Sequence, residues 1–335
     1  MPRVSFVFAD GEEVSCNAST DETILAAAQA AGIPLASDCH VGDCQTCRAH
    51  LKSGKIEIDE IAFITLDDEE IEGGAILTCI SMAKEDLKIE LSYLRGHILP
   101  EKRYLMKIRD VVQLSATTAR LRGQLPNGSV FRFFPGQYAN IKIPGSGVLR
   151  SYSMANDPAE PNSLEFHIRM LPDGQMSNFI GKPDLAGTSL ELLGPKGVFY
   201  LREGNSPIVM IAGGTGLAPM VSMLRSIVQG RQIERSIVLC FGVNRPGDLY
   251  YVEELEELKG SLPNLEVRLS MTEADGAWSG HKGLVTELVG PNDIGEPTQI
   301  YLCGPPLMIA AARKRVAACG GRRNSVYAEE FLATG

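Results

Sequence analysis

The chain has 335 residues, of which 44% are hydrophobic and 22% are charged, a composition typical of soluble globular proteins. Its length predicts more than one domain, and its patterning predicts three. The net charge of −9 is uneven, because residues 1–95 hold 18 acidic and only 7 basic side chains. This distribution excludes nucleic acid as an expected partner. The acidic part is either a docking surface for a basic protein or a solvated face around acids such as Asp67–Glu70.

No segment is typical of export or of membrane insertion. The first residues, MPRVSFVFADGEEV, lack the charged start and apolar block of a signal peptide. No run approaches the roughly 20 apolar residues of a membrane span. We therefore expect a cytoplasmic protein that does not bind membranes, and we expect a monomer.

Residues 1–95 are predicted to form a small α+β domain. The apolar alternation of residues 4–8 before Asp10-Gly11 predicts a β-hairpin with a primed turn. A helix should follow, capped by Thr20, with two acids in its first turn and with Gly32 at its end. A cysteine-rich loop and further short strands complete this domain.

The rest of the chain is predicted to hold two further domains. Residues 100–203 carry short β-like runs separated by Gly and Pro, which indicates an antiparallel β-barrel. Residues 207–335 alternate apolar runs with helical patterns, which indicates an α/β parallel sheet. The expected strands of this last domain are 208–212, 237–241, 265–271 and 300–303, and its expected helices are 217–229, 252–259 and 306–319.

Four cysteines are crowded into one part of the sequence. Cys39, Cys44, Cys47 and Cys79 have the spacing C-x4-C-x2-C-x31-C, which is the plant-type pattern for a [2Fe-2S] cluster. Two irons need four thiolates, and Gly42 lets the loop backbone come close to the cluster. A structural zinc ion is the alternative, although zinc modules favour paired cysteine knuckles.

The segment SDCHVGDCQTC, together with Cys79, resembles the cluster loop of plant-type ferredoxins. Those loops usually carry glycine where this chain has Gln45. The departure leaves all four ligands in place. We expect the extra side chain to change the hydrogen bonding around the cluster, and with it the reduction potential.

Two motifs in the second domain resemble the flavin site of the ferredoxin-NADP reductase superfamily. The first motif could also be an ordinary β-strand with alternating polar and aromatic residues, and the joint occurrence of the two motifs favours the flavin. The first matches R-x-Y-S, and the resemblance implies an arginine on the pyrophosphate, a tyrosine against the flavin ring and a serine near flavin N5. The second opens a helix as G-x-x-S, and together they imply FAD more than FMN. The predicted residues are Arg150, Ser151, Tyr152, Ser153, Ile168, Arg169, Gly174, Met176 and Ser177.

A glycine-rich turn begins the third domain. Gly213, Gly214, Thr215 and Gly216 follow a predicted strand and open a helix that contains Pro219, which is the context that dinucleotide binding requires. The alternative is a tight strand-to-helix turn without a ligand. This pattern predicts a nicotinamide dinucleotide site.

Specificity for the ribose 2′-position is expected after the second strand. An acidic residue there favours NADH, and an arginine can accommodate the 2′-phosphate of NADPH. Both Asp248 and Arg245 are present. We expect NADH, with NADPH as the alternative.

Two further segments resemble that superfamily. Cys303, Gly304 and Pro305 resemble its C-G-P motif, which lies near the nicotinamide, and Glu329-Glu330-Phe331 resembles an ending whose aromatic ring covers the flavin. The resemblance implies catalytic roles for Ser153, Cys303 and Phe331. A buried structural thiol and a hydrophobic anchor are the respective alternatives.

In this order of domains the whole chain resembles the single-chain reductase component of bacterial aromatic-ring-hydroxylating dioxygenases, of the benzoate or naphthalene type. The resemblance implies transfer of electrons from NADH to FAD, then to the cluster, and then to a terminal oxygenase. A diiron monooxygenase or a deoxysugar dehydratase could be the acceptor instead. A zinc-stabilised nucleotide-binding regulator is the alternative from another class.

Overall fold

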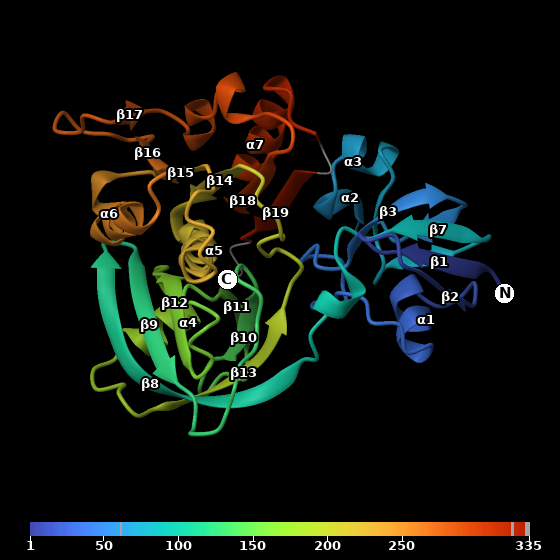
Figure 1. Cartoon of the computed structure of the whole chain (residues 1–335). Coiled ribbons are helices and arrows are strands. Elements are labelled where there is room, and N and C mark those ends of the chain that lie inside the picture. The colour runs from blue at the N-terminus through green and yellow to red at the C-terminus, as the bar shows by residue number, and fades with distance from the viewer. Residues whose placement is uncertain (61, 323–324, 332–335) are drawn as a thin grey trace. The chain divides into compact units, whose positions relative to one another are not determined.

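The computed structural model describes residues 1–60, 62–322 and 325–331 and divides the chain into two compact units. One unit holds residues 1–100 with 196–198, and the other holds 101–195 with 199–335. The sheets confirm the predicted fold class, because one α+β unit, one antiparallel sheet and one parallel sheet follow each other along the chain (Figure 1). Domain boundaries near residues 95, 203 and 207 stay a prediction.

The N-terminal unit is built on a five-stranded sheet in the order β2-β1-β7-β3-β5, with a separate pair β4-β6. Strands β1 and β7 are parallel, and the other pairs of the larger sheet are antiparallel. Its strands are β1 (Arg3–Val7), β2 (Glu13–Asn17), β3 (Arg48–Ser53), β4 (Ile56–Ile58), β5 (Ala75–Leu77), β6 (Ser81–Ala83) and β7 (Leu87–Glu90). Its helices are α1 (Ile24–Ala30), α2 (Ala62–Thr65), α3 (Asp68–Glu72) and the 3₁₀ turn η1 (Arg95–His97).

The predicted primed turn of the first hairpin is wrong. The Gly11 amide donates to the Phe8 carbonyl at 2.9 Å, and the Phe8 amide donates to the Glu12 carbonyl at 2.9 Å. Gly11 has a φ of 87°, whereas Asp10 does not have a positive φ. A primed turn of type I′ needs positive φ at both central residues, so this is a three-residue loop that ends in a left-handed glycine.

The predicted cap of the first helix is also wrong. Thr23 is the N-cap of α1, and its side chain accepts from the Ala26 amide. Asp21 and Glu22 therefore precede the helix instead of lying in its first turn. Gly32 does follow the helix end, with a φ of 70°.

The second sheet is the predicted antiparallel barrel, with strand order β11-β10-β13-β8-β9-β12. An isolated bridge between Met154 and Phe166 brings the two ends of this order together. The barrel core is formed by apolar residues such as Leu121, Ile141 and Leu190. Its elements are β8 (Lys102–Ser115), β9 (Thr118–Gln124), β10 (Tyr138–Lys142), β11 (Leu149–Ser153), β12 (Ser163–Arg169), α4 (Gln175–Ile180) and β13 (Ser189–Lys196).

The third sheet is parallel, in the order β17-β16-β15-β14-β18-β19. Its strands are β14 (Ile208–Gly213), β15 (Ile237–Val243), β16 (Leu265–Met271), β17 (His281–Lys282), β18 (Gln299–Gly304) and β19 (Val326–Glu330). Its helices are η2 (Gly214–Gly216), α5 (Leu217–Gln229), η3 (Pro246–Asp248), α6 (Val252–Ser261), η4 (Val285–Leu288), η5 (Pro291–Asp293) and α7 (Pro306–Ala318).

The strand order reverses direction at β14, because β15 and β16 extend the sheet on one side and β18 and β19 on the other. In open α/β sheets, ligands bind beyond the carboxyl ends of the strands at such a point. The predicted glycine-rich turn directly follows β14. The topology therefore places this turn where a ligand is expected.

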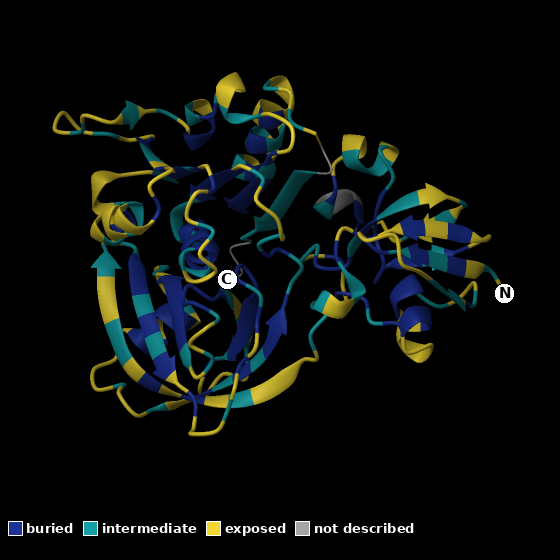
Figure 2. Cartoon of the chain, in the orientation of Figure 1, coloured by how far each residue is buried: buried dark blue, intermediate teal, exposed yellow. Residues whose placement is uncertain are grey.

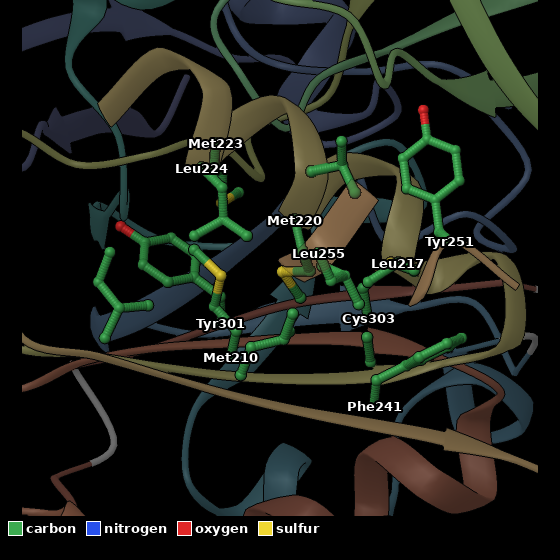
Figure 3. Packing of buried hydrophobic residues seen from close by; sticks show 14 of the residues in the cluster. Met210, Leu217, Met220, Met223, Leu224, Phe241, Tyr251, Leu255, Tyr301 and Cys303 are labelled. Carbon is green, nitrogen blue, oxygen red and sulfur yellow. The ribbon is translucent and has the colours of Figure 1, made fainter. Parts of the chain in front are cut away.

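Apolar side chains bury one face of the parallel sheet under α5. Met210, Leu217, Phe241 and Cys303 belong to one cluster (Figure 3). The central strands are mostly buried, whereas α6 exposes its outer side (Figure 2). In the described part of the chain, no helix has the length and apolar character needed to cross a bilayer.

Candidate functional site

The four predicted cluster cysteines lie together in the N-terminal unit. The Sγ atoms of Cys47 and Cys79 are 3.2 Å apart. The Cys39 sulfur accepts from the Cys44 amide at 3.4 Å, and the Cys44 sulfur accepts from the Cys39 amide at 3.5 Å. None of the four is in a disulfide. Sulfur atoms gathered around backbone N–H donors are the environment that an iron–sulfur cluster requires, so this donor set fits a [2Fe-2S] cluster.

The cluster loop depends on left-handed backbone conformations. His40, Gly42 and Gln45 have φ values of 60°, 87° and 55°. The glutamine therefore occupies a conformation that favours glycine. Its side chain compensates by donating to the Thr65 carbonyl at 3.3 Å and accepting from Arg48 Nη1 at 3.0 Å.

A structural zinc ion is the alternative for the same four thiolates. Tetrahedral zinc needs four ligands around one centre, whereas a two-iron cluster takes two thiolates at each iron. The four gathered sulfurs satisfy either requirement.

Strand β11 carries the first predicted flavin motif at the edge of the barrel sheet. Arg150 and Tyr152 share one face of the strand, and Ser151 and Ser153 share the other. The Ser151 hydroxyl donates to Asn140 Oδ1 at 2.7 Å. Tyr152 is half-buried, and burial raises the pKa of its hydroxyl. The strand thus presents one cation, one aromatic ring and one buried serine, a set that fits a flavin nucleotide.

Ser153 meets an acid that the sequence reasoning had not assigned. Its hydroxyl donates to Glu329 Oε2 at 3.1 Å, across 176 residues of sequence. Glu329 pairs with Cys303 between β18 and β19. Ser153, Glu329 and Cys303 are therefore connected by one hydrogen bond and one strand pairing. The acidic residue at the start of the C-terminal Glu329-Glu330-Phe331 segment was the sequence signal for this connection.

The second flavin motif opens the short helix α4, with Gly174 as its N-cap. A Cβ on this residue would lie 3.1 Å from both the Leu171 Cβ and the Ser177 Oγ, so glycine permits the close approach. Ser177 accepts from the Leu171 amide at 2.8 Å. Ile168 and Met176 are buried in the barrel core, so only their backbone atoms could contact a cofactor.

Five of the predicted nucleotide residues, Gly213, Gly214, Thr215, Asp248 and Pro305, line a cavity of about 170 Å³ in the C-terminal unit, whereas Gly216, Pro219, Cys303 and Gly304 do not line it. Gly213, Gly214 and Thr215 form one wall, together with Pro305 and Met308. Gly242 and Ser270 of the parallel sheet also line it, and the barrel contributes Thr117, Thr118 and Arg169. Arg169, predicted as a flavin residue, therefore faces the nucleotide cavity.

Close packing restricts two glycines of the turn, Gly216 strictly because it faces backbone atoms, and Gly213 less so because it faces the flexible Met308 side chain. A Cβ on Gly213 would lie 2.6 Å from the Met308 sulfur, and a Cβ on Gly216 would lie 2.6 Å from the Cys303 carbonyl carbon. Pro219 is buried in α5 and serves the helix itself. The turn thus lies at the start of α5, where backbone N–H groups are expected to point to an anion, and it adjoins the cavity.

The cavity also contains an unsatisfied hydroxyl. Ser270 is 1% exposed, and its Oγ has no hydrogen-bond partner among the residues that the structure describes. An unpaired buried hydroxyl costs about 1–3 kcal/mol. The polar groups of a dinucleotide could supply the missing partner, so the cavity fits this ligand.

Cys303 lies near the end of β18, and Phe331 directly follows β19. Cys303 is completely buried, and burial followed by the charge of Glu329 raises the pKa of its thiol well above the usual range. The Phe331 amide donates to the Gly304 carbonyl at 2.9 Å, and its ring packs against the cluster that contains Cys303. The aromatic ring and the thiol thus share one apolar environment.

The two residues predicted to select the 2′-position have different surroundings. Asp248 lines the cavity and accepts from Thr117 Oγ1 at 2.8 Å. Arg245 does not line it, and its Nε atom lies 2.8 Å from Glu273 Oε2. The carboxylate is therefore available to a ribose, whereas the guanidinium is held by an acid.

Comparison with protein families divides the chain in three. Residues 7–84 match the 2Fe-2S iron-sulfur cluster binding domain, residues 105–200 match the oxidoreductase FAD-binding domain, and residues 210–314 match the oxidoreductase NAD-binding domain. The matches agree with the three cofactors predicted from the motifs.

Curated relatives and solved structures share the whole arrangement. The toluate 1,2-dioxygenase electron transfer component of Pseudomonas putida is 35% identical over 99% of both chains. The xylene/toluene monooxygenase electron transfer component of the same species is 34% identical over 98% of this chain and 94% of its own. The crystal structure of an Amycolatopsis cytochrome P450 reductase matches with a TM-score of 0.73 and 26% identity over 98% of each chain.

These similarities extend over the full length, so the four cysteines, the flavin strand and the glycine-rich turn belong to one electron-transfer system. The chain is therefore a member of the single-chain NAD(P)H-dependent oxidoreductases that combine a 2Fe-2S ferredoxin domain with FAD- and NAD-binding domains, the family of the oxygenase electron transfer components.

Proposed function

We propose that this protein takes electrons from NADH, passes them through FAD and the [2Fe-2S] cluster, and delivers them to a terminal aromatic-ring-hydroxylating dioxygenase. One observation carries the proposal: a nucleotide cavity, a flavin strand and a four-cysteine loop occur in a single chain. When bound, the flavin accepts a hydride and releases single electrons, which matches a two-electron donor to one-electron acceptors.

The residues of the chain have separable tasks in this proposal. The turn at Gly213–Gly216 and the barrel residue Arg169 bind the dinucleotide phosphates, Arg150 binds the flavin phosphates, and Ser153 orients the flavin through its link to Glu329. Phe331 would cover the face of a bound flavin and exclude water from it. The thiols of the cluster loop form the exit.

NADH is the proposed donor because of the charged side chains expected near the 2′-position of the bound ribose. Asp248 can accept hydrogen bonds from a ribose diol, and the same carboxylate would repel a 2′-phosphate. Arg245, the residue that could attract this phosphate, is paired with Glu273 on the protein surface.

The cluster is proposed as the exit, and a cysteine substitution tests this role. Cys44→Ser should leave the NADH-to-ferricyanide activity largely intact and abolish transfer to cytochrome c or to an oxygenase, because only the cluster route is lost. Cys16→Ser is the matched control, since this thiol lies in β2 outside the loop. Loss of both activities in the Cys44 variant alone would show that the cluster is not merely the exit.

The identity of the acceptor is the finer part of the proposal. The two curated relatives serve a dioxygenase and a monooxygenase and are almost equally similar, so the names alone do not decide. The test is NADH-dependent product formation with purified oxygenases of each class and with a deoxysugar dehydratase. Turnover only with a diiron monooxygenase or only with the dehydratase would refute the choice of a ring-hydroxylating enzyme.

The acidic charge of residues 1–95 is the proposed docking determinant. Asp67 and Glu70 form a capping box, and Glu70 also pairs with Arg48 at 2.7 Å, so these two acids have structural roles. Asp68 and Glu69 are exposed. Neutralising both should slow electron transfer to a basic acceptor at low salt without changing ferricyanide reduction. An unchanged salt dependence would support the solvated-face interpretation instead.

We also propose that the protein works as a cytoplasmic monomer. Sedimentation of the cofactor-loaded protein tests the oligomeric state, and cell fractionation tests the location.

A further inference from the structure

A group of buried polar side chains connects barrel strand β12 to the nucleotide sheet within the C-terminal unit. Glu165 on β12 accepts from the Tyr251 hydroxyl at 2.5 Å and lies 3.2 Å from Arg225 Nη1 of α5. His167, two residues further along the strand, is completely buried and places its Nε2 atom 3.3 Å from the same carboxylate oxygen. None of these side chains has a role in the proposed electron path.

The group ends at the glycine-rich turn. The Tyr250 hydroxyl lies 3.4 Å from His167 Nδ1 and 3.3 Å from the Gly214 carbonyl oxygen. The Tyr250 ring is held edge-on against both His167 and Phe241, with centroid distances of 5.4 and 5.6 Å. Tyr250 is therefore the side chain through which the buried group touches the turn.

The protonation of His167 determines what Tyr250 can do. Burial opposes ionisation of Glu165, but the hydrogen bond from His167 and the charge of Arg225 lower the pKa of Glu165 to about 2. A carboxylate only accepts, so the facing Nε2 atom of His167 must carry a hydrogen. In neutral His167 the Nδ1 atom is then an acceptor and takes the single hydroxyl hydrogen of Tyr250.

Protonated His167 reverses this last bond. Its Nδ1–H donates to the Tyr250 oxygen, and the hydroxyl hydrogen of Tyr250 is free to donate to the Gly214 carbonyl. The same two distances therefore support two hydrogen-bond patterns, which differ by one proton on His167.

We infer that Tyr250 is a positioning residue for the phosphate-binding turn, and that the proton on His167 sets the direction of the Tyr250 hydroxyl bond. The inference rests on the nucleotide role of the turn in the proposed function. The peptide between Gly214 and Thr215 carries the contacted carbonyl and the Thr215 N–H group. A hydrogen bond to the carbonyl polarises the peptide and strengthens its N–H as a donor to an anion.

The direction of the effect follows from these bonds. Protonation of His167 fixes the Gly214 carbonyl and adds a positive charge near the turn, and both changes favour an anionic ligand. Burial lowers the pKa of His167, so the imidazole is neutral at neutral pH and becomes protonated as the pH falls. Affinity for a pyrophosphate should therefore rise towards acidic pH.

Other charged and titratable groups face His167 from each neighbouring element. Arg120 is its cross-strand partner on β9, Arg225 comes from α5, and Tyr251 precedes α6. Both arginines oppose protonation of the imidazole, and Glu165 on the same strand favours it. Among these groups His167 is the one whose ordinary pKa of about 6.5 lies near neutral pH, and burial lowers it from there, because arginine and buried tyrosine titrate far above neutral pH.

The experiment measures the dissociation constant of ADP-ribose for the cofactor-loaded protein between about pH 5 and 8. Its pyrophosphate keeps the same charge over this range, and changes in the flavin absorbance report binding. In the unmodified protein the dissociation constant should fall by about two- to tenfold towards the acidic end, which is the range expected for one hydrogen bond.

Tyr250→Phe removes the hydroxyl and retains the ring, so its profile should be clearly shallower than that of the unmodified protein, because only the charge of His167 remains, and its FAD content should be unchanged. Tyr251→Phe is the matched control. It loses the bonds to Glu165 and Arg225 but has no bond to the turn, so it should keep most of the pH dependence even if its melting temperature falls.

Each outcome decides the inference. A flat profile in the unmodified protein overturns it without requiring any variant. The same slope in the unmodified protein and in Tyr250→Phe also overturns it, as does an equal loss of slope in both tyrosine variants. Absence of ADP-ribose binding at every pH would instead refute the nucleotide role of the turn, and with it the proposed function.

Discussion

Gly216 is the position where a single methyl group should do the most specific damage to the nucleotide site. Its φ of −59° is accessible to every residue, so alanine would cause no backbone strain. A Cβ there would lie 2.6 Å from the Cys303 carbonyl carbon and 3.2 Å from the Gly304 amide nitrogen. These are backbone atoms of a buried strand, so no side chain can rotate away.

The magnitude follows from the overlap. Ordinary carbon contacts are about 3.5–4.0 Å, so the turn or the end of β18 must move by about 1 Å. Forcing an extra methyl group into a packed site costs about 1–3 kcal/mol of unfolding free energy. For a unit of this size, we expect Gly216→Ala to lower the melting temperature by about 3–10 °C. A displacement of this size should also raise the KM for NADH by about tenfold or more.

Gly260→Ala is the control. This glycine lies in α6, and a Cβ there would have nothing within 4 Å. Alanine is the better helix former, so this variant should gain about 0.5–1 kcal/mol and keep its KM. Both variants are compared by thermal unfolding and NADH–ferricyanide kinetics. A Gly216→Ala protein with the melting temperature and KM of the unmodified chain would refute the requirement for close packing of the turn against β18.

Three further predictions concern single side chains. Gln45→Ala should destabilise the cluster loop by about 1 kcal/mol or more, because it loses two hydrogen bonds and keeps the left-handed strain, whereas Gln45→Gly should be close to neutral. Thermal bleaching of the cluster absorbance measures this difference, and equal effects would contradict it. Arg245→Ala should change kcat/KM for NADH by no more than about twofold, since the guanidinium is in an exposed ion pair; loss of a dominant NADPH activity would contradict the proposed donor. Glu165→Gln should make the free energy of unfolding depend less on pH in the acidic range. The lowered pKa of Glu165 contributes about 3 kcal/mol to this free energy above about pH 4.5, and the contribution is lost as the pH falls towards 2. Identical acid-unfolding curves would show that Glu165 contributes nothing.

The nucleotide sheet is where sequence reasoning was most successful. The predicted helix 217–229 and the predicted strand 265–271 coincide with α5 and β16. Buried parallel strands give continuous apolar runs, and the surrounding helices have their own amphipathic pattern, so local sequence determines these elements. The cluster ligands could be predicted equally well from the sequence, since the spacing of the cysteines is a local signal.

The errors lie where tertiary contacts choose between local alternatives. Thr20 and Thr23 are both acceptable caps for α1, and the choice of Thr23 coincides with a β-bridge between Thr23 and Met82. The barrel wall of the nucleotide cavity was missed for a similar reason. Thr117 reaches Asp248 across 131 residues, and such a separation leaves no pattern in a single sequence.

The carboxylate of Glu165 has a consequence for recombination between related genes. Its partners Tyr251 and Arg225 belong to the nucleotide sheet, so a chimera that joins this barrel to a sheet lacking them would bury a negative charge without compensation. Crossover points between β13 and β14 should therefore give few functional hybrids unless both partners are exchanged with the acid. The cysteine-bearing unit has its own hydrogen-bonded sheet, but it also includes residues 196–198, where Lys196 at the end of β13 pairs with Asp38 at 2.7 Å, so its exchange should require both partners of this ion pair.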